Sequence, residues 1–341
     1  MIPENKVFIG IDVSKATLDI SISGRHFKIE NSEKTLNSFI SEAILDKQIE
    51  PELVCLESTG GYEIDAIRCF QRAKMPIHRA HPNKVYSFAK ASGHFAKTDK
   101  LDAKLLEKYA AFVCDKEKGD HPRSDDAYEL RELRNIERNL MEDLHAAQCR
   151  IKNSHGRATA HIQSQIDFIK EQLNKVRKDI DEVIKSDADL DQKQKLLTSY
   201  KGIGKRIASV LLSELPELGM LDNKAIASLA GVAPKTYESG IKSRVGHIFG
   251  GRFYVRKALY MAALVASRHN KQMKVVYERL IAVGKKPKVA LVAIMRKIVI
   301  CLNVMLRNKA SFQEPLSKMA LAVSSLAKVM PTAAKPTMSL F

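Results

Sequence analysis

Apolar residues at the start of the chain follow the pattern of short strands. Val7, Phe8, Ile9 and Ile11 lie in VFIGIDVSK, and ATLDISIS and GRHFKIEN follow after short polar turns. Nearly continuous or alternating apolar runs of this length, separated by turn residues, are typical of strands joined as hairpins. The opening therefore predicts a three-stranded antiparallel meander.

Strand and helix patterns then alternate up to about residue 120. A helical pattern covers residues 33–45 and a strand pattern covers ELVCLEST (52–59). GYEIDAIRCFQRAK, PIHRAHP, NKVYSFAKAS and LDAKLLEKYAAFVC then have the patterns of a helix, a strand and two helices. Crossovers that follow a meander predict a mixed sheet flanked by helices.

Residues 122–195 have the pattern of long polar helices with a narrow apolar stripe. Apolar residues step by three and four from Leu133 to Ile151, and strictly 4-3-4-3-4-3 from Ile162 to Val183. Such a heptad pattern indicates a coiled-coil seam, which suits an antiparallel pair or an oligomer. Because few apolar residues flank the seam, we favour a partner helix or a second protomer over packing within one domain.

Residues 196–312 are helical in pattern. SYKGIGKRIASVLLSEL (199–215) places a GxG turn between two helical patterns, which resembles a helix-hairpin-helix that brings backbone N–H groups close to a phosphate. Further helical patterns follow, and the last two meet at GKKPK (284–288). The tail 313–341 predicts a weak helix and then disorder. The fold class is therefore α/β followed by all-α.

The composition adds a strong bias of charge. Apolar residues make up 45% and charged residues 28%, but 56 Lys and Arg against 39 Asp and Glu give a net charge of +17. Between residues 201 and 309 there are 21 Lys and Arg against 5 Asp and Glu, so this third of the chain carries +16. The balance favours a polyanionic partner, most often nucleic acid, that docks on this region.

Three other classes of protein are disfavoured. The start MIPENK has no signal-peptide pattern, and the apolar run 289–306 is interrupted by Arg296 and Lys297, so we expect no membrane span. The five cysteines have no CxxC spacing. We therefore expect reduced core cysteines in a cytoplasmic protein, without disulfides or a zinc site.

Four acids suggest chemistry. Asp12 and Glu57 end two apolar strands, and Asp99 and Asp102 lie three apart at the start of a helix, on one of its faces. Four converging carboxylates would repel each other without cations, and oxygen ligands suit Mg²⁺ or Mn²⁺. In a basic protein this predicts two-metal phosphoryl transfer on a nucleic-acid backbone. Taken singly, Asp99 also fits a helix N-cap and Glu57 a surface acid.

Two neighbouring features are assigned no chemistry. Asp19 alternates with Leu18 and Ile20, so we expect its side chain to face solvent. The pair Gly60–Gly61 lacks the GxxxxGK[ST] pattern, so we assign no nucleotide site to it.

Several motifs, in order, resemble one family. GIDVSKATLDI, LESTGGYE, HPNKVYSFAKASG and KTDKLDA resemble the RuvC-like, ribonuclease-H-like domain of the DEDD insertion-sequence transposases. KGIGKRIASVLLSEL, LAGVAPKTYESGIKSRVGHIFGGRFYVRKALYMAA and GKKPKVALVAIMRKI resemble the C-terminal part of these proteins. This is the insertion-sequence one-ten family, which includes pilin-gene inverting recombinases and bridge-RNA-guided recombinases. The similarity covers roughly residues 5–310.

The resemblance implies a domain order. It consists of a RuvC-like metal-binding domain (1–121), a coiled-coil or oligomerisation region (122–195), a basic helical domain with the nucleophile (196–312) and a weakly structured tail (313–341).

The resemblance also assigns the site residues. It implies that Mg²⁺ or Mn²⁺ is held by the four acids, namely Asp12, Glu57, Asp99 and Asp102, and that Ser239 is a nucleophile. A loop Ser–Gly pair is otherwise the pattern of a turn, and Ser243 lies close enough in sequence to be the alternative serine. Our candidates for contacts with nucleic-acid backbone are Lys201, Lys205, Arg206, Lys242, Arg244, Arg252, Arg256, Lys257, Lys285, Lys286, Lys288, Arg296 and Lys297.

The implied activity is site-specific recombination or transposition of a mobile element through a covalent phosphoserine–DNA intermediate. The implied partners are donor and target DNA, a structured bridge RNA that reads sequence by base pairing, and further copies of the chain, as dimers that pair into tetramers. In such an assembly the acid domain of one protomer lies beside the serine domain of another. We expect this protein in the bacterial or archaeal cytoplasm, associated with the nucleoid.

Three alternatives stay open from the residues. One is a metal-dependent nuclease of the Holliday-junction type, in which water attacks and Ser239 is idle. Another is a non-catalytic nucleic-acid scaffold. The third is an actin-like sugar kinase, since GID near the start also opens that fold, but the basic helical region disfavours it.

Overall fold

The computed structural model describes residues 6–93, 99–115, 124–235, 238–239, 242–243 and 247–312. The predictions for the tail 313–341 and for Arg244 lie outside these residues. The chain divides into two compact units, residues 1–122 and 123–341. The helical residues that follow position 123, which we predicted as a separate region, belong to the second unit.

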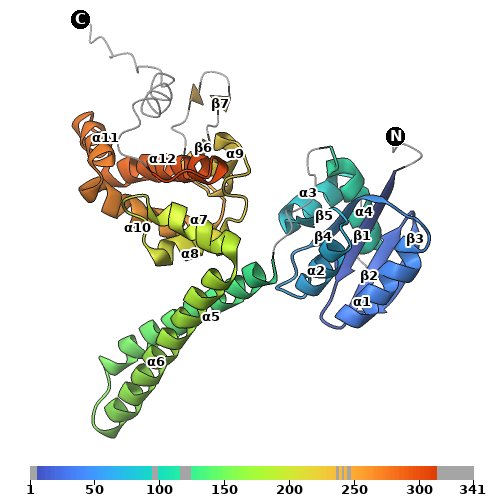
Figure 1. Ribbon diagram of the computed structural model, residues 1–341, viewed down its shortest axis with the longest axis horizontal. Helices are drawn as coiled ribbons and strands as arrows, with labels where there is room; N and C mark the ends of the chain where they lie inside the picture. The colour runs from blue at the N-terminus through green and yellow to red at the C-terminus, as the bar shows by residue number, and fades with distance from the viewer. Residues whose placement is uncertain are drawn as a thin grey trace, which may run out of the picture. The chain divides into compact units, whose positions relative to one another are not determined.

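The first unit is built on a five-stranded sheet in the order β3-β2-β1-β4-β5 (Figure 1). Its strands are β1 (Val7–Val13), β2 (Thr17–Ile22), β3 (Arg25–Glu30), β4 (Pro51–Glu57) and β5 (Ile77–Ala80). The first three strands form an antiparallel meander, and β4 and β5 continue the sheet in parallel with β1. The predicted mixed sheet is confirmed.

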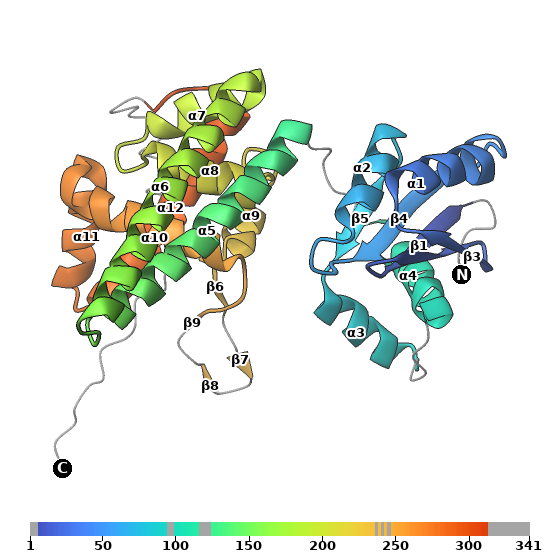
Figure 2. The same cartoon turned by 90° about the horizontal axis from the view of Figure 1, so that it is seen from below.

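Helices cover both faces of this sheet. They are α1 (Glu33–Phe39), α2 (Ile64–Arg72), α3 (Pro82–Ala91) and α4 (Asp99–Val113), and α1 continues as a π-helix, η1 (Ile40–Leu45). Figure 2 shows α1 and α2 on one face and α3 and α4 on the other. The rings of Phe27 and Phe39, 5.4 Å apart, join β3 to α1.

The packing of α4 on β1 requires a residue without a side chain. A Cβ atom on Gly10 would lie 2.1 Å from the carbonyl oxygen of Ala103 and 2.2 Å from the amide nitrogen of Glu107. These distances are far below van der Waals contact, so the backbones of α4 and β1 touch at Gly10. Buried Phe8 and Leu106 belong to the core between the two elements.

The second unit is largely helical. Its helices are α5 (Asp125–Ile151), α6 (Arg157–Ser186), α7 (Ala188–Thr198), α8 (Lys205–Glu214), α9 (Asn223–Leu229), α10 (Phe253–His269), α11 (Lys271–Ala282) and α12 (Pro287–Arg307). Four two-residue strands lie between α9 and α10, namely β6 (Pro234–Lys235), β7 (Glu238–Ser239), β8 (Lys242–Ser243) and β9 (His247–Ile248).

The predicted heptad helices pack against each other. α5 and α6 form a long antiparallel hairpin (Figure 1), and the seam residues Ile169, Leu173 and Ile180 are buried in it. The seam of α6 therefore meets a partner helix of the same chain, α5, which is the antiparallel pair that we predicted as one of two arrangements. The base of the hairpin joins the core of the second unit through Leu130 and Ile184.

A buried charge cluster lies between these two helices. Glu137 of α5 is 2% exposed, forms an ion pair with Arg134, and accepts a 3.0 Å hydrogen bond from Nε of Arg177 on α6. This buried polar contact inside an apolar seam helps to fix the register of the two helices, because a slip of α6 would remove Arg177 from Glu137.

The apolar run near the C-terminus forms the core helix α12. By length and composition α12 could cross a membrane, since its most apolar window has a mean hydropathy of 2.2. However, 56% of that window is buried within the chain, where α12 packs against α7, α9, α10 and α11. Its apolar face is therefore used as the core of the second unit.

Our prediction for the cysteines is correct in part. All five are free thiols. Cys55 and Cys69 are buried, Cys114 and Cys301 are partly buried, and burial raises the pKa of the Cys301 thiol to about 11. Cys149 is exposed, so the expectation that all five lie in the core is wrong for Cys149, which occupies the outer face of a two-helix hairpin.

The base of the hairpin is closed by two interlocked helix caps. Ser124 caps α5 and donates a 2.7 Å hydrogen bond to Asp187, and Asp187 caps α7 by accepting from the amides of Asp189 and Leu190. Burial alone would raise the pKa of Asp187, but these hydrogen bonds hold that pKa below its ordinary value.

The contact at Gly10 gives a first prediction. We expect Gly10→Ala to lower the free energy of unfolding by about 2–3 kcal/mol, because the new methyl group overlaps the backbone of α4. Chemical denaturation measures the loss. The control Gly204→Ser adds a side chain where nothing lies within 4 Å, at a helix N-cap that favours serine, and should be near neutral. Equal effects for both variants would contradict the tight contact.

Asp187 gives a prediction of pH dependence. Because its pKa is lower in the folded state, its contribution is complete above the ordinary aspartate pKa of about 3.9 and is lost as pH falls through the folded value. We expect Asp187→Asn, which can still cap a helix, to show a smaller loss of stability below about pH 4 than the unsubstituted chain. Urea unfolding between acidic and neutral pH tests this. The variant of an exposed acid in the same hairpin, Asp143→Asn, should keep the original slope.

Candidate active site

Two of the predicted acids end neighbouring parallel strands. Ile11 of β1 pairs with Leu56 of β4, so the next residues, Asp12 and Glu57, occupy adjacent positions at the carboxyl ends of these strands. Side chains alternate along a strand, so Asp12 lies on the face of Gly10, which α4 covers. Glu57, at the adjacent position, lies on the same face. We call this end of the sheet the acid edge.

Helix α4 directs its first turn toward the acid edge. Phe8, early in β1, shares a core with Val113 near the end of α4, whereas Gly10 contacts Ala103. Successive positions along β1 therefore meet earlier positions along α4, and the N-terminus of α4 lies toward Asp12.

The other two acids belong to this first turn. Asp102 precedes the sheet-facing Leu106 by one helical turn, so it lies on the same side of α4. Asp99 is the first residue of α4 and precedes Ala103 by one turn, but its side chain lies outside the described residues. The backbone thus brings all four positions to one end of the sheet.

The donor chemistry at the acid edge suits a hard divalent cation. Among the side chains that the structure describes, no three His, Cys, Asp or Glu residues lie close enough together to hold a metal ion. Mg²⁺ does not require such a set, because one or two carboxylates with water and phosphate oxygens complete its octahedral shell. Asp12, Glu57 and Asp102 supply only oxygen donors, so the residues fit Mg²⁺ or Mn²⁺.

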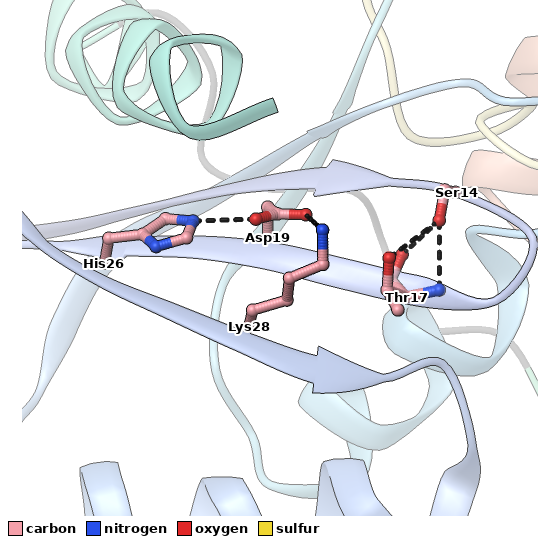
Figure 3. Close-up of polar contacts among 5 residues, drawn as sticks. All are labelled: Ser14, Thr17, Asp19, His26 and Lys28. Carbon is pink, nitrogen blue, oxygen red and sulfur yellow. Dashed lines mark hydrogen bonds and ion pairs between the residues drawn. The ribbon is translucent and has the colours of Figure 1, made fainter. Parts of the chain in front are cut away.

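Asp19 corrects one of our predictions. It is only 5% exposed, and it pairs directly with Asp12 across β1 and β2. Its Oδ1 lies 2.7 Å from Nε2 of His26 and its Oδ2 lies 3.3 Å from Nζ of Lys28, both on β3 (Figure 3). The alternation of Asp19 with Leu18 correctly separated two faces, but both faces are covered by helices.

The cations on β3 explain how Asp12 and Asp19 can lie directly opposite each other on neighbouring strands. Like charges directly opposite each other on a sheet are destabilising. His26, when protonated, and Lys28 offset the charge of Asp19, and both draw its carboxylate toward β3. Asp19 is therefore a structural neighbour of the acid edge, which sequence reasoning missed.

The turn after Asp12 is closed by local hydrogen bonds. The Ser14 hydroxyl donates to the carbonyl of Thr17 at 2.8 Å, and the Thr17 amide donates to the same hydroxyl at 3.0 Å (Figure 3). This closed turn fixes the β1–β2 hairpin immediately beyond Asp12.

The loop after Glu57 is organised by another buried acid. Glu63 is 2% exposed and accepts hydrogen bonds from the amides of Thr59 (3.2 Å) and Gly61 (2.8 Å), while Arg79 lies 3.6 Å away. The Glu63 carboxylate therefore orders the loop that follows Glu57 by binding its backbone amides. It ends the motif LESTGGYE, and this position in the motif was the available signal for it.

The predicted nucleophile lies on a small hairpin in the second unit. Ser239 of β7 pairs with Lys242 of β8, and Glu238 pairs with Ser243. The structure describes the backbone of these four residues, while their side chains lie outside its description.

Two glycines close the base of the segment that carries this hairpin. Gly231 and Gly251 both have φ of +70°, and a Cβ atom on Gly251 would lie 2.3 Å from Cα of Gly231. Pairing of β6 with β9 continues this contact outward. We call the segment between these two glycines, which carries position 239, the serine arm, and its base is tightly closed.

Two of the predicted backbone-binding arginines are used inside the second unit. Arg252 forms a two-pronged ion pair with Glu217 at 2.5 and 2.6 Å, and donates at 2.8 Å to the carbonyl of Glu214. Arg256 donates to the carbonyl oxygens of Gly250 and Gly251. These bonds support the base of the serine arm, and net charge alone could not distinguish such arginines from surface cations.

Most other predicted contact residues are exposed. Arg296 and Lys297 on α12 are partly buried, and burial together with Arg279 and Arg296 lowers the pKa of Lys297. The exposed members are Lys201, Lys205, Arg206, Lys257, Lys285, Lys286 and Lys288.

The GxG turn joins two helices, as we predicted. α7 ends at Thr198 and α8 begins at Lys205, with Gly204 as an N-cap that provides no side-chain hydrogen bond. Gly202, with φ of +116°, packs against α10, where its Cβ would lie 3.3 Å from the carbonyl oxygen of Ala262. Ile203 is buried, whereas Gly204 and Lys205 at the start of α8 are exposed, so the first backbone amides of α8 lie at the surface.

The sheet with its acid edge, followed by a basic helical region, defines a nucleic-acid-processing enzyme. Comparison with known families specifies this class. The model of a DEDD transposase domain, described as "Transposase", matches residues 9–154, and the model "Transposase IS116/IS110/IS902 family" matches residues 194–278. The chain belongs to the IS110/IS116/IS902 transposase family, and it is an enzyme that cleaves DNA and transfers its strands. Its first unit is ribonuclease-H-like.

Curated relatives agree with this assignment. The chain is 27% identical over 325 residues to the "Pilin gene-inverting protein" of Moraxella lacunata, covering 91% of this chain and 98% of that protein. The protein of the same name from Moraxella bovis is 26% identical with the same coverage. An "Insertion element IS110 uncharacterized 43.6 kDa protein" from Streptomyces coelicolor is 31% identical over 120 residues, which are 35% of this chain and 30% of that protein.

The ion pairs of the buried Asp19 side chain give a prediction for the first unit. We expect Asp19→Ala to lower the free energy of unfolding by about 2 kcal/mol, because His26 and Lys28 lose their acceptor at a buried position. Thermal or urea unfolding measures the loss. Glu52→Ala, which removes an exposed ion pair with Lys6, should change stability by less than about 0.5 kcal/mol. An Asp19→Ala variant as stable as the Glu52→Ala variant would refute this role of Asp19.

Proposed function

We propose that this transposase is a site-specific recombinase of a mobile element that cuts and rejoins DNA through a covalent phosphoserine intermediate. The observation that supports it most directly is the convergence of four acidic positions, from β1, β4 and the first turn of α4, on one end of a RuvC-like sheet. The serine arm of the second unit carries the nucleophile that the family resemblance assigns.

The acids would bind Mg²⁺ or Mn²⁺. Bound there, the metal would supply Lewis-acid stabilisation of charge on the phosphate oxygens. Asp12, Glu57, Asp99 and Asp102 are the residues that would hold it. Their placement on a strand pair and a helix held by backbone contact gives the rigid support that such a site needs.

The serine step conserves the phosphodiester bond. The Ser239 oxygen forms a bond to phosphorus, the bond from phosphorus to one sugar oxygen breaks, and the proton lost by the serine is balanced by the one that the leaving hydroxyl gains. Attack by a hydroxyl of another strand reverses these changes and frees the serine. Because each step exchanges one ester for another, no ATP is required.

Partners follow from charge and from the family. The charge of +16 between residues 201 and 309 supports binding of donor and target DNA and of a structured bridge RNA that reads sequence by base pairing. We also propose assembly as dimers that pair into tetramers. Exposed apolar side chains on the α5–α6 hairpin, Ile136, Met141 and Phe168, support a protein contact there, in place of the seam. The reaction would take place in the cytoplasm, with the cellular DNA.

The covalent step is the part of the proposal that a single experiment tests. The protein is incubated with donor DNA, RNA from the flank of its element and Mg²⁺, and a denaturant-stable protein–DNA adduct is sought by electrophoresis and mapped by mass spectrometry. We expect the adduct at Ser239, its loss of at least 100-fold in Ser239→Ala, and its retention in Ser243→Ala.

The acids provide the second arm of this experiment. Asp12→Asn and Glu57→Gln should lose the adduct while binding DNA normally, because the acids act on the reacting phosphate. Full recombination by Ser239→Ala would sink the proposal in favour of a Holliday-junction-type nuclease in which water attacks. Unchanged function in the acid variants would instead indicate a scaffold.

A further inference from the structure

Helix α4 carries a row of lysines on its solvent side. Lys100, Lys104 and Lys108 are all exposed and follow each other at intervals of four residues, and exposed Phe112 continues the row. Residues four apart lie on the same side of a helix, about 6 Å apart along its axis. We call these four residues the α4 stripe.

The spacing of the lysines in the α4 stripe destabilises the helix slightly. Like charges at i and i+4 destabilise a helix slightly, and this cost is normally offset by acids nearby. In the described part of the chain, no ion pair joins any of these three lysines to an acid. A bound row of phosphates would provide the missing negative charge, since a nucleic-acid strand carries a negative charge on each of its phosphates.

The aromatic end of the α4 stripe is held in place from below. The ring of Phe112 is 64% exposed, and its centroid lies 5.1 Å from that of Phe88 on α3 at an angle of 33°. Phe88 in turn contacts Tyr109, which is only 4% exposed, at 5.4 Å. An exposed ring that packs on a partly buried ring, which in turn packs on buried Tyr109, is a platform for stacking that needs little ordering when a base binds.

A second exposed aromatic residue lies on the neighbouring helix. Tyr86 of α3 is 61% exposed, and Nζ of Lys90 lies 4.5 Å from its ring centroid. Aromatic rings interleaved with cations are the usual surface for single-stranded nucleic acid, because every base has a face to stack and every nucleotide a phosphate to neutralise.

The α4 stripe begins at the acid edge. Lys100 follows Asp99 directly, so the lysines lead from the first turn of α4 toward its C-terminal end. A strand whose phosphodiester lies at the acids can therefore continue along the stripe.

We propose that the α4 stripe binds the phosphate backbone and one unpaired base of the DNA strand that leaves the acid edge. This inference relies on the proposed function only for the place of cleavage. DNA is favoured over RNA as the occupant because the acid edge acts on the strand that is cut, and the stripe continues from it. The cations predicted from the sequence to contact nucleic acid all lie between residues 201 and 297, so this surface of the first unit is additional.

The test measures binding of the full chain to a single-stranded DNA oligonucleotide, without divalent cations, over a series of salt concentrations. We expect Lys104→Gln/Lys108→Gln to reduce the slope of log affinity against log salt by about 1.4, because two phosphate contacts are lost. The control Lys34→Gln/Lys47→Gln removes two exposed lysines of the same unit and the same charge, and should leave the slope unchanged.

Stacking is tested separately with a fluorescent 2-aminopurine placed along the oligonucleotide. We expect Phe112→Leu to abolish quenching at one position and to weaken binding about tenfold, whereas Phe112→Tyr should retain both. Equal slopes for the two lysine pairs, or quenching unaffected by Phe112→Leu, would overturn the proposal. Tighter binding of RNA than of DNA of the same sequence through these residues would also overturn it, by assigning the stripe to the guide.

These measurements are independent of the covalent chemistry. They use uncut DNA and no metal, so Ser239→Ala should bind like the unsubstituted chain. If the lysine variants did not change the salt slopes, the prediction of an adduct at Ser239 would still stand. If no adduct formed at Ser239, the predicted salt slopes would still stand.

Discussion

The backbone contact between Gly10 of β1 and helix α4 is the constraint on which the candidate site depends. With no side chain at position 10, the carbonyl of Ala103 and the amide of Glu107 come directly against the strand. This fixes the height of α4 over the sheet, and with it the position of the first turn that carries Asp102. A larger residue would separate the helix from the strand pair that ends in Asp12 and Glu57. The arrangement of the acids at the acid edge therefore depends on Gly10, a residue without a functional side chain.

Buried acids around that edge stabilise its surroundings. Asp19 is bound by His26 and Lys28, and Glu63 is bound by backbone amides and faces Arg79. Ion pairs or hydrogen bonds within the first unit compensate for the burial of each acid, because an unpaired buried carboxylate would cost folding free energy. These acids order the surroundings of the two strands that carry Asp12 and Glu57. Asp19 and Glu63 are therefore structural carboxylates. The four carboxylates at the acid edge are the ones that the family resemblance assigns to the metal.

Charge is used in different ways in the two units. In the second unit, Arg252 donates hydrogen bonds to Glu217, and Arg256 donates to the carbonyls of Gly250 and Gly251. These bonds support the base of the serine arm. In the first unit, exposed lysines on α4 have no such role. A count of charges along the chain therefore overstates the cations available between residues 201 and 309 and overlooks those beside the acid edge. Burial and partners, which differ between equal charges, decide which cations can meet a polyanion.

Local pattern by itself determined the strands, the mixed sheet, the helices, the ends of the strands that carry Asp12 and Glu57, and the heptad seam. These features depend on periodicity and on residues near each other in sequence. Tertiary structure decided that Asp19 is buried, that the seam of α6 meets α5 of the same chain, that Cys149 is exposed and that Arg252 is paired. Periodicity separates one face of an element from the other, but what covers each face depends on contacts between residues far apart in the chain. The sequence therefore identified the candidate positions, and only the packed fold decided which of their neighbours are structural.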